Sequence, residues 1–171
     1  MDYTPGIFVM DLASVTEGRN TSWVNATIAN QLALYVTLYS PLQMAADLPE
    51  HYAQFMDAFQ FIKDVDIDWI QSKYLLAEPG EYVVVARQGK KAGQWFCGGV
   101  TDDHKRTLEV PMNFLEPGKT YEATIYADAE DADYKKNPQA YRIWKQDVTS
   151  EDTLSMFMAP GGGFAISFLE K

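Results

Sequence analysis

The chain has one cysteine, Cys97, and two histidines, His51 and His104, in 171 residues. A lone cysteine cannot build an internal disulfide framework, and no Cys cluster is present to bind zinc. Basic residues are also few: the chain has 14 Lys and Arg against 24 Asp and Glu, which gives a net charge of −10. Nucleic acids and anionic lipid surfaces are bound through basic surfaces. We therefore expect no nucleic acid and no membrane among the partners.

Long apolar runs are missing as well. The longest, residues 32–38, ends shortly before Ser40-Pro41 and is far shorter than the roughly 20 residues that span a bilayer. No basic segment precedes an apolar one near Met1, as it would in a secretory signal peptide. We expect a cytoplasmic chain, or a targeting segment that lies outside this sequence.

What the chain does contain is apolar residues, 47% of the total, which is enough for a packed core. The first third reads as helix. A helix is predicted at about residues 25–39, after capping side chains at Asn20-Thr21-Ser22. It is apolar almost all round, which is typical of a helix buried on several sides. Pro41 ends it. A second amphipathic stripe follows, at Tyr52, Phe55, Met56, Phe59 and Ile62.

From residue 68 onward, short alternating segments separated by turn signals predict strands. Residues 121–128 are the clearest case, since apolar and polar side chains alternate there. Seven or eight such strands indicate an antiparallel sandwich or barrel. The predicted fold class is therefore α+β, with a helical part at residues 1–70 and an all-β domain at 71–171. The predicted strands are residues 73–77, 81–88, 95–100, 106–110, 121–128, 141–148, 154–158 and 164–168.

Few residues suggest chemistry. The acidic residues 128–133 could hold calcium, but they lack the EF-hand glycine and final glutamate, which favours a solvated loop. Gly161-Gly162-Gly163 precedes an alternating strand, which favours a tight turn over a phosphate-binding loop. Cys97 reads as a small buried side chain. No carboxylate pair stands out for glycosidase chemistry. The sequence therefore predicts no catalytic and no metal-binding residue.

Aromatic residues leave one binding role open. Trp23, Trp69, Trp95 and Trp144, with ten tyrosines, could include a platform on which a sugar stacks. Aromatic residues also dominate ordinary cores. Asn20 and Asn25 each begin a glycosylation pattern, which helix capping explains equally well.

Several strings together resemble the C-terminal end of glycoside hydrolase family 97, a family of α-glucosidases and α-galactosidases. They follow the family's order over nearly the whole chain. The strings are Met1-Asp2-Tyr3-Thr4-Pro5-Gly6, Asn30-Gln31-Leu32-Ala33-Leu34-Tyr35-Val36, Tyr39-Ser40-Pro41-Leu42-Gln43-Met44, Gly80-Glu81-Tyr82-Val83-Val84-Val85-Ala86-Arg87, Tyr121-Glu122-Ala123-Thr124-Ile125-Tyr126 and Ala159-Pro160-Gly161-Gly162-Gly163-Phe164.

The resemblance implies a three-part architecture, with an N-terminal β-sandwich, a central (β/α)8 barrel and a C-terminal β-domain. Residues 1–70 would be the end of the barrel with its last helices, and residues 71–171 the whole C-terminal domain. The family's catalytic carboxylates and calcium-ligating glutamates precede the segment of residues 2–6. The resemblance therefore assigns no catalytic residue, metal ligand or cofactor to this chain, although the full-length family can use calcium. It implies a periplasmic location for full-length members. The start at Met1 suggests a truncated gene, an internal start or an expressed fragment.

Two functions follow as alternatives. The chain is a structural and oligomerisation portion of an α-glycosidase, inactive alone, or a stand-alone carbohydrate-binding β-domain that uses exposed aromatic residues. In the first case we expect self-association or contact with the rest of the glycosidase, through helix faces left bare by the missing barrel. The rival is that the helices collapse onto the β-domain within one monomer. We expect the β-domain to fold without the helices, but not the reverse. The candidate interface residues are Ile28, Leu32, Tyr35, Phe55 and Phe59.

Overall fold

The structure is a computed structural model and describes residues 4–19 and 21–171. The predicted cap at Asn20 and the first three residues of the predicted opening loop lie outside the described residues. The helices are α1 (Leu12–Val15), α2 (Ile28–Thr37), α3 (Pro49–Tyr52) and α4 (Met56–Asp64). The strands are β1 (Trp69–Glu78), β2 (Tyr82–Gly89), β3 (Gln94–Thr101), β4 (Arg106–Pro111), β5 (Tyr121–Asp128), β6 (Tyr141–Val148), β7 (Thr153–Met158) and β8 (Gly163–Glu170).

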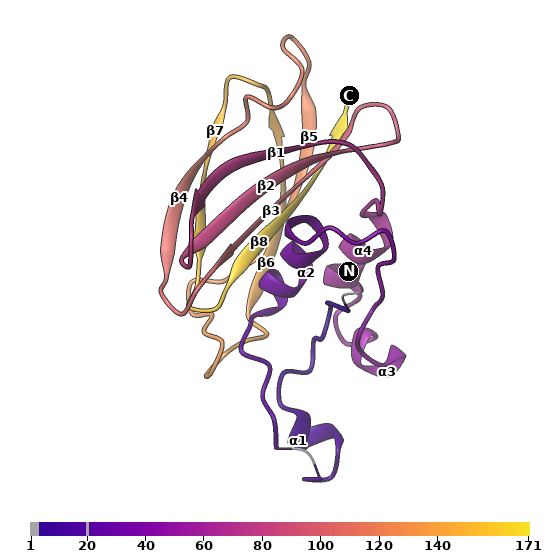
Figure 1. The fold of residues 1–171 in the computed structure, drawn as a ribbon, viewed down its shortest axis with the longest axis vertical. Helices are drawn as coiled ribbons and strands as arrows, with labels where there is room; N and C mark the ends of the chain where they lie inside the picture. The colour runs from indigo at the N-terminus through magenta and orange to yellow at the C-terminus, as the bar shows by residue number, and fades with distance from the viewer. Residues whose placement is uncertain (1–3, 20) are drawn as a thin grey trace.

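Six strands form one antiparallel sheet in the order β1-β2-β3-β8-β5-β6, and β4 pairs with β7 in a second sheet of two strands. The two sheets pack face to face, and the helices lie on the opposite face of the large sheet (Figure 1). The prediction of an antiparallel sandwich is confirmed, and the predicted segments match eight strands of the described chain closely. The largest difference is β1, which begins at Trp69 rather than near residue 73.

The core of the sandwich lies between the two sheets. Along the central strands every second residue points into it, as the pleat of a strand requires. Trp95 and Cys97 of β3 and Ile166 of β8 are at most 1% exposed there, and Val110 and Met156 close the core from the small sheet. Cys97 is a small buried side chain, as predicted, and burial raises the pKa of its thiol.

The alternate residues of the same strands form a second core on the helical side. Phe96, Tyr126 and Ala165 pack there against Leu32 of α2 and Phe61 of α4. The central strands are therefore buried on both faces. One core draws on both the helical part and the strands, so the two predicted parts are in direct contact, while their division at residue 70 stays a prediction.

Helix α2 lies directly on β3, and Gly98 makes this possible. A Cβ atom at Gly98 would stand 2.8 Å from the carbonyl oxygen of Ala33 and 2.9 Å from the Cβ of Val36. Such a separation is below van der Waals contact, so only glycine lets the helix backbone approach the strand this closely.

The helix limits differ from the predicted ones for local reasons. Thr27 caps α2, because its side-chain oxygen accepts a hydrogen bond of 3.1 Å from the Asn30 amide, so the predicted capping by Thr21 and Ser22 is wrong. The helix also ends at Thr37, shorter than the predicted 25–39. The predicted second stripe is split into α3 and α4, and Pro49 begins α3.

A hairpin-like arm extends from the body between Met10 and Val24 and carries α1 (Figure 1). Asp11 and Trp23 form an isolated bridge at its base. Val15 and Trp23 are each 39% exposed on it. No helix in the described part of the chain is long and apolar enough to cross a membrane.

Candidate association surface

The five candidate interface residues fall into two groups. Ile28, Leu32 and Tyr35 are at most 2% exposed, because the face of α2 that carries them packs inside the second core. The prediction that these three side chains are exposed is therefore wrong, and the helices pack onto the β-domain as in the rival interpretation. Phe55 and Phe59 are half-buried at the edge of the same core. Their part in an interface stays a prediction.

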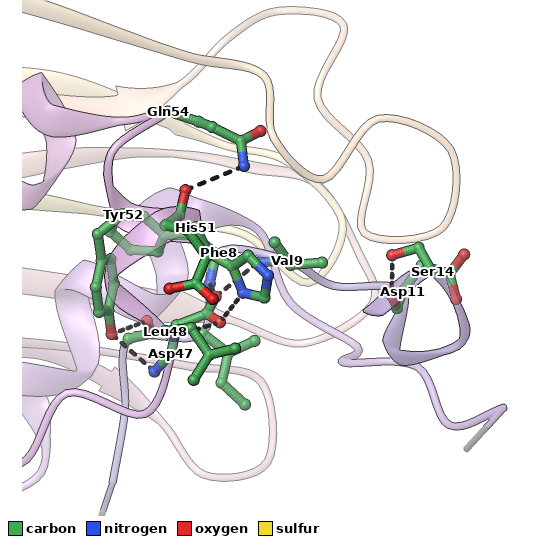
Figure 2. A network of polar contacts seen from close by, with 12 residues as sticks. Phe8, Val9, Asp11, Ser14, Asp47, Leu48, His51, Tyr52 and Gln54 are labelled. Carbon is green, nitrogen blue, oxygen red and sulfur yellow. Dashed lines mark hydrogen bonds and ion pairs between the residues drawn. The ribbon is translucent and has the colours of Figure 1, made fainter. Parts of the chain in front are cut away.

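The Asp47 carboxylate binds the backbone of the extended segment at Phe8 and Val9 (Figure 2). Its Oδ2 accepts hydrogen bonds of 2.8 and 2.9 Å from the Phe8 and Val9 amides, and Oδ1 accepts from Leu48 and pairs with His51 Nδ1. Burial raises the pKa of Asp47, but the hydrogen bonds from His51 and these amides outweigh it and hold the pKa below its usual value. The Asp47 carboxylate therefore links the extended segment at residues 8–9 to the segment before α3.

Two tyrosines complete that attachment. Tyr52 donates its hydroxyl hydrogen to the Gly6 carbonyl at 2.6 Å and accepts from the Asp47 amide at 3.0 Å. The hydroxyl of Tyr35 lies 2.9 Å from the Met44 carbonyl oxygen, and burial raises its pKa. The helical part is thus held by buried polar contacts as well as by apolar packing.

A cation lies at the C-terminal end of α2. Arg87 of β2 is 5% exposed, and its Nε donates to the Val36 carbonyl oxygen at 2.5 Å, while Nη1 donates to Ser72 Oγ. The rings of Tyr39 and Trp69 lie 5.8 and 5.9 Å from the guanidinium. The exposed carbonyl groups at a helix C-terminus favour a positive charge, so Arg87 stabilises the helix where it meets the sheet.

An acid lies at the other end of α2. Asp128, the last residue of β5, is fully buried, and its Oδ2 accepts hydrogen bonds of 2.8 Å from the amides of Ala159 and Gly163. Burial raises the pKa of Asp128 to about 6, although these bonds and one from the Thr27 hydroxyl oppose the shift. Asp128 is buried in a strand, so it is not part of the predicted solvated loop, whereas Glu130 and Asp131 of that loop are exposed.

The rest of that loop uses its acids locally. Asp131 accepts from Asn137 Nδ2, and Asp133 accepts from the amides of Lys135 and Lys136. The acidic loop therefore serves to connect β5 and β6.

The predicted tight turn at Gly161 lies elsewhere, between β7 and β8. Gly161 has a φ of +64°, as such a turn requires.

Within the described residues, one group could offer three metal ligands, namely Asp102, Asp103 and His104. Arg106 already donates to Asp102 Oδ1 at 2.9 Å, so the positive charge beside that carboxylate is the Arg106 guanidinium. We assign no metal to this group.

The four tryptophans do not share one face. Trp95 is 1% exposed in the sandwich core, and Trp69 and Trp144 are half-buried against different cores. Trp23 is the exposed one, on the arm, where its Nε1 donates to the Tyr134 carbonyl. The predicted carbohydrate face thus lacks a row of tryptophans, and carbohydrate binding itself stays a prediction.

An open groove of about 530 Å³ lies where β1, β2 and β3 extend beyond α2. Its walls are mostly apolar. Tyr74 at its rim is 71% exposed, and Ile70, also on β1, is 61% exposed. This surface is not among the predicted sites. The groove is lined by Tyr74, Ala77, Glu78, Pro79, Gly80, Glu81, Tyr82, Val83, Val100, Thr101 and Asp102.

The fold is an antiparallel sandwich with helices on one outer face and an open, mostly apolar groove. Residues 68–169 match the family model described as "Glycosyl-hydrolase 97 C-terminal, oligomerisation". The chain therefore belongs to glycoside hydrolase family 97, and this stretch is the family's C-terminal oligomerisation domain.

Two curated relatives and a solved structure agree with this family. The chain is 33% identical to a retaining alpha-galactosidase of Bacteroides thetaiotaomicron, over 97% of this chain and 24% of that protein. It is 32% identical to a probable retaining alpha-galactosidase of Streptomyces bingchenggensis, over 96% and 23%. A Glycoside Hydrolase Family 97 enzyme in complex with acarbose from Pseudoalteromonas sp. strain K8 matches with a TM-score of 0.94 and 46% identity, over 100% of this chain and 26% of that one.

A beta-arabinopyranosidase shares the fold at a TM-score of 0.78 and 19% identity. The chain spans about a quarter of the length of the curated relatives and of the family 97 structure.

Proposed function

We propose that this chain is the association module of a family 97 α-glycosidase and that it has no glycosidase activity by itself. The observation that carries the proposal is the match of residues 68–169 to the family's oligomerisation domain, in a chain that spans about a quarter of its relatives. In this proposal the chain brings copies of the enzyme together.

We further propose that the helical part is the end of the catalytic barrel. The family model begins at residue 68, whereas the likeness to the Pseudoalteromonas enzyme covers 100% of this chain. Residues before 68 thus correspond to a part of that enzyme that precedes its C-terminal domain. Exposed apolar side chains of this part support a neighbouring surface, namely Leu42, Leu48 and Met56, which are at least 50% exposed.

The reaction belongs, in this proposal, to the portion of the enzyme outside residues 1–171. Glycoside hydrolysis needs two carboxyl groups on either side of one bond, about 5 to 10 Å apart. The relatives' names indicate α-galactosides as substrates of the whole enzyme. Any calcium ligands would lie with the catalytic pair.

Two measurements on the purified chain test the proposal. Sedimentation equilibrium at several concentrations should show reversible association, and a monomer at every concentration would contradict the association role. Aryl α-galactosides and α-glucosides should not be hydrolysed. Turnover that disappears when an Asp or Glu of this chain is replaced would contradict the absence of activity.

A further inference from the structure

The two edges of the six-stranded sheet differ in how they meet solvent. Edge strands invite pairing with another chain, and proteins commonly protect them with charges. At the β6 edge such charges are present and paired, since Lys145 contacts Glu122 and Lys171 contacts Asp147, each at 2.6 Å. This edge is protected.

At the other edge, β1 pairs with β2 alone among the described strands. Two of its large exposed side chains are apolar or aromatic, Ile70 at 61% and Tyr74 at 71%. They are more exposed than any other large hydrophobic side chain among the described residues. An aromatic side chain with a polar hydroxyl is the kind of group that anchors protein interfaces. The β1 edge therefore has the composition of a contact surface.

The groove beside Tyr74 supplies a matching hollow. Tyr74 pairs with Val85 and Ala77 pairs with Val83, so all four side chains point to the helical face of the sheet. Ala77 and Val83, with Val100 of β3, line the groove. Its floor is small and apolar, whereas its rim carries the large Tyr74 ring.

The charges of β1 are complementary to those of a second, antiparallel β1. When a two-fold axis between Leu75 and Leu76 relates the two β1 strands, Lys73 lies opposite Glu78 of the second copy. Tyr74 then lies opposite Ala77 of that copy. Neither Lys73 nor Glu78 forms an ion pair within the described part of the chain, and both are exposed. The register with β2 places each pair on one face of the sheet, because the irregularity between Tyr74 and Leu76 shifts the alternation by one residue.

We propose that the β1 edge and its groove form a two-fold symmetric interface with a second copy of this chain, in which Tyr74 of each copy enters the groove of the other. The contact is between side chains, because an irregularity in β1 between Tyr74 and Leu76 interrupts the regular ladder. The inference rests on the proposed function.

The position of these residues favours a second copy as the occupant. Tyr74, Ala77, Val83 and Val100 all lie within residues 68–169, the range of the oligomerisation domain. The exposed apolar side chains of the helical part, such as Met56, lie outside that range. We therefore assign the groove to the second copy and the helical surface to the rest of the enzyme.

The test is sedimentation equilibrium of the full chain and its variants, each checked for a cooperative thermal melt. Y74D should raise the dimer dissociation constant roughly 30-fold, as the loss of a central interface tyrosine does. L169S is the matched control, because Leu169 is 59% exposed but does not line the groove. It should change the constant by less than about twofold.

A charge exchange makes the test independent of folding defects. K73E and E78K should each weaken self-association about tenfold, because like charges then face each other across the axis. An equimolar mixture of the two variants should associate again, since each copy then presents the complementary pair to the other. A double variant K73E/E78K should likewise associate with itself.

The outcomes separate this inference from the proposed function. A wild-type chain that is monomeric at every concentration would overturn both. A wild-type dimer that is unchanged by Y74D and by the charge variants would overturn the β1 interface alone and leave the association role intact. A groove occupied by the rest of the enzyme would give that second result.

Discussion

Arg87 of β2 donates from Nε to the carbonyl oxygen of Val36 at 2.5 Å, in the last turn of α2. At the other end of the same helix, the carboxylate of Asp128 accepts from the Thr27 hydroxyl. A helix has a partial negative charge at its C-terminus, so Arg87 offers that end a charge of the favourable sign, while Asp128 offers the Thr27 cap a buried hydrogen-bond acceptor. Helix α2 is therefore held to the sheet by electrostatics as well as by apolar packing.

Replacing Arg87 by methionine should destabilise the fold by about 2 to 4 kcal/mol, because the buried Val36 carbonyl loses a charged donor. R87K should cost less, because lysine keeps the positive charge, although it cannot reproduce the planar guanidinium that donates to both Val36 and Ser72. Urea unfolding of both variants measures the difference. Equal stability of R87M and the wild type would show that the contact contributes nothing.

Asp128 should make the fold less stable as pH rises from about 4 to 6. Its pKa is raised from 3.8 to about 6 in the folded state, so between these values the unfolded chain loses the proton and the folded chain keeps it. The effect reaches at most about 3 kcal/mol. D128N should remove this pH dependence. Unfolding free energies of wild type and D128N at pH 4 to 7 measure it, and parallel curves would contradict the prediction.

Asp47 should act in the opposite direction. Its pKa is lowered in the folded state, so its contribution is complete above the unfolded value of 3.8 and is lost as pH falls through the folded value. D47N should cost about 1 to 3 kcal/mol at pH 7, and the cost should shrink in acid. Thermal melts at pH 7 and pH 3 test this. A penalty that grows in acid would have the wrong sign.

Gly98 should not tolerate alanine. The added methyl group would press against the backbone of α2 at Ala33 and move the helix off the sheet, at a cost of about 1 to 3 kcal/mol. G89A is the control, because its Cβ would meet only the end of the Asp66 side chain closer than 3.4 Å. Denaturation midpoints compare them, and an equally stable G98A would mean that α2 does not lie so close.

Much of the sandwich could be predicted from local pattern. The alternation in residues 121–128 predicted a strand, and β5 has these bounds, although Tyr126 and Asp128 on its other face are buried as well. The Pro79-Gly80 turn lies between β1 and β2, where Gly80 has a φ of +85°. The same reasoning placed a buried helix around Leu32, which is 1% exposed in α2.

The partner of that helix could not be predicted in the same way. The face of the sheet that receives α2 includes Gly98 and Ala165, and such small residues carry no hydrophobic pattern. From the sequence, the helix has more apolar surface than its neighbours along the chain can cover, and the pattern therefore predicts an interface at Ile28, Leu32 and Tyr35.

The sequence by itself determined which segments are strands, which helix is buried, and that the chain resembles the C-terminal end of family 97, because these depend on neighbouring residues and on ordered motifs. Only the tertiary structure decided which surfaces remain open. In it, α2 packs against the chain's own sheet, and Asp128 and Arg87 are buried at the two ends of that helix. Tyr74 remains exposed beside a groove. Exposure depends on contacts between residues far apart in the chain, such as Asn30 with Gly162, and no local pattern records these contacts.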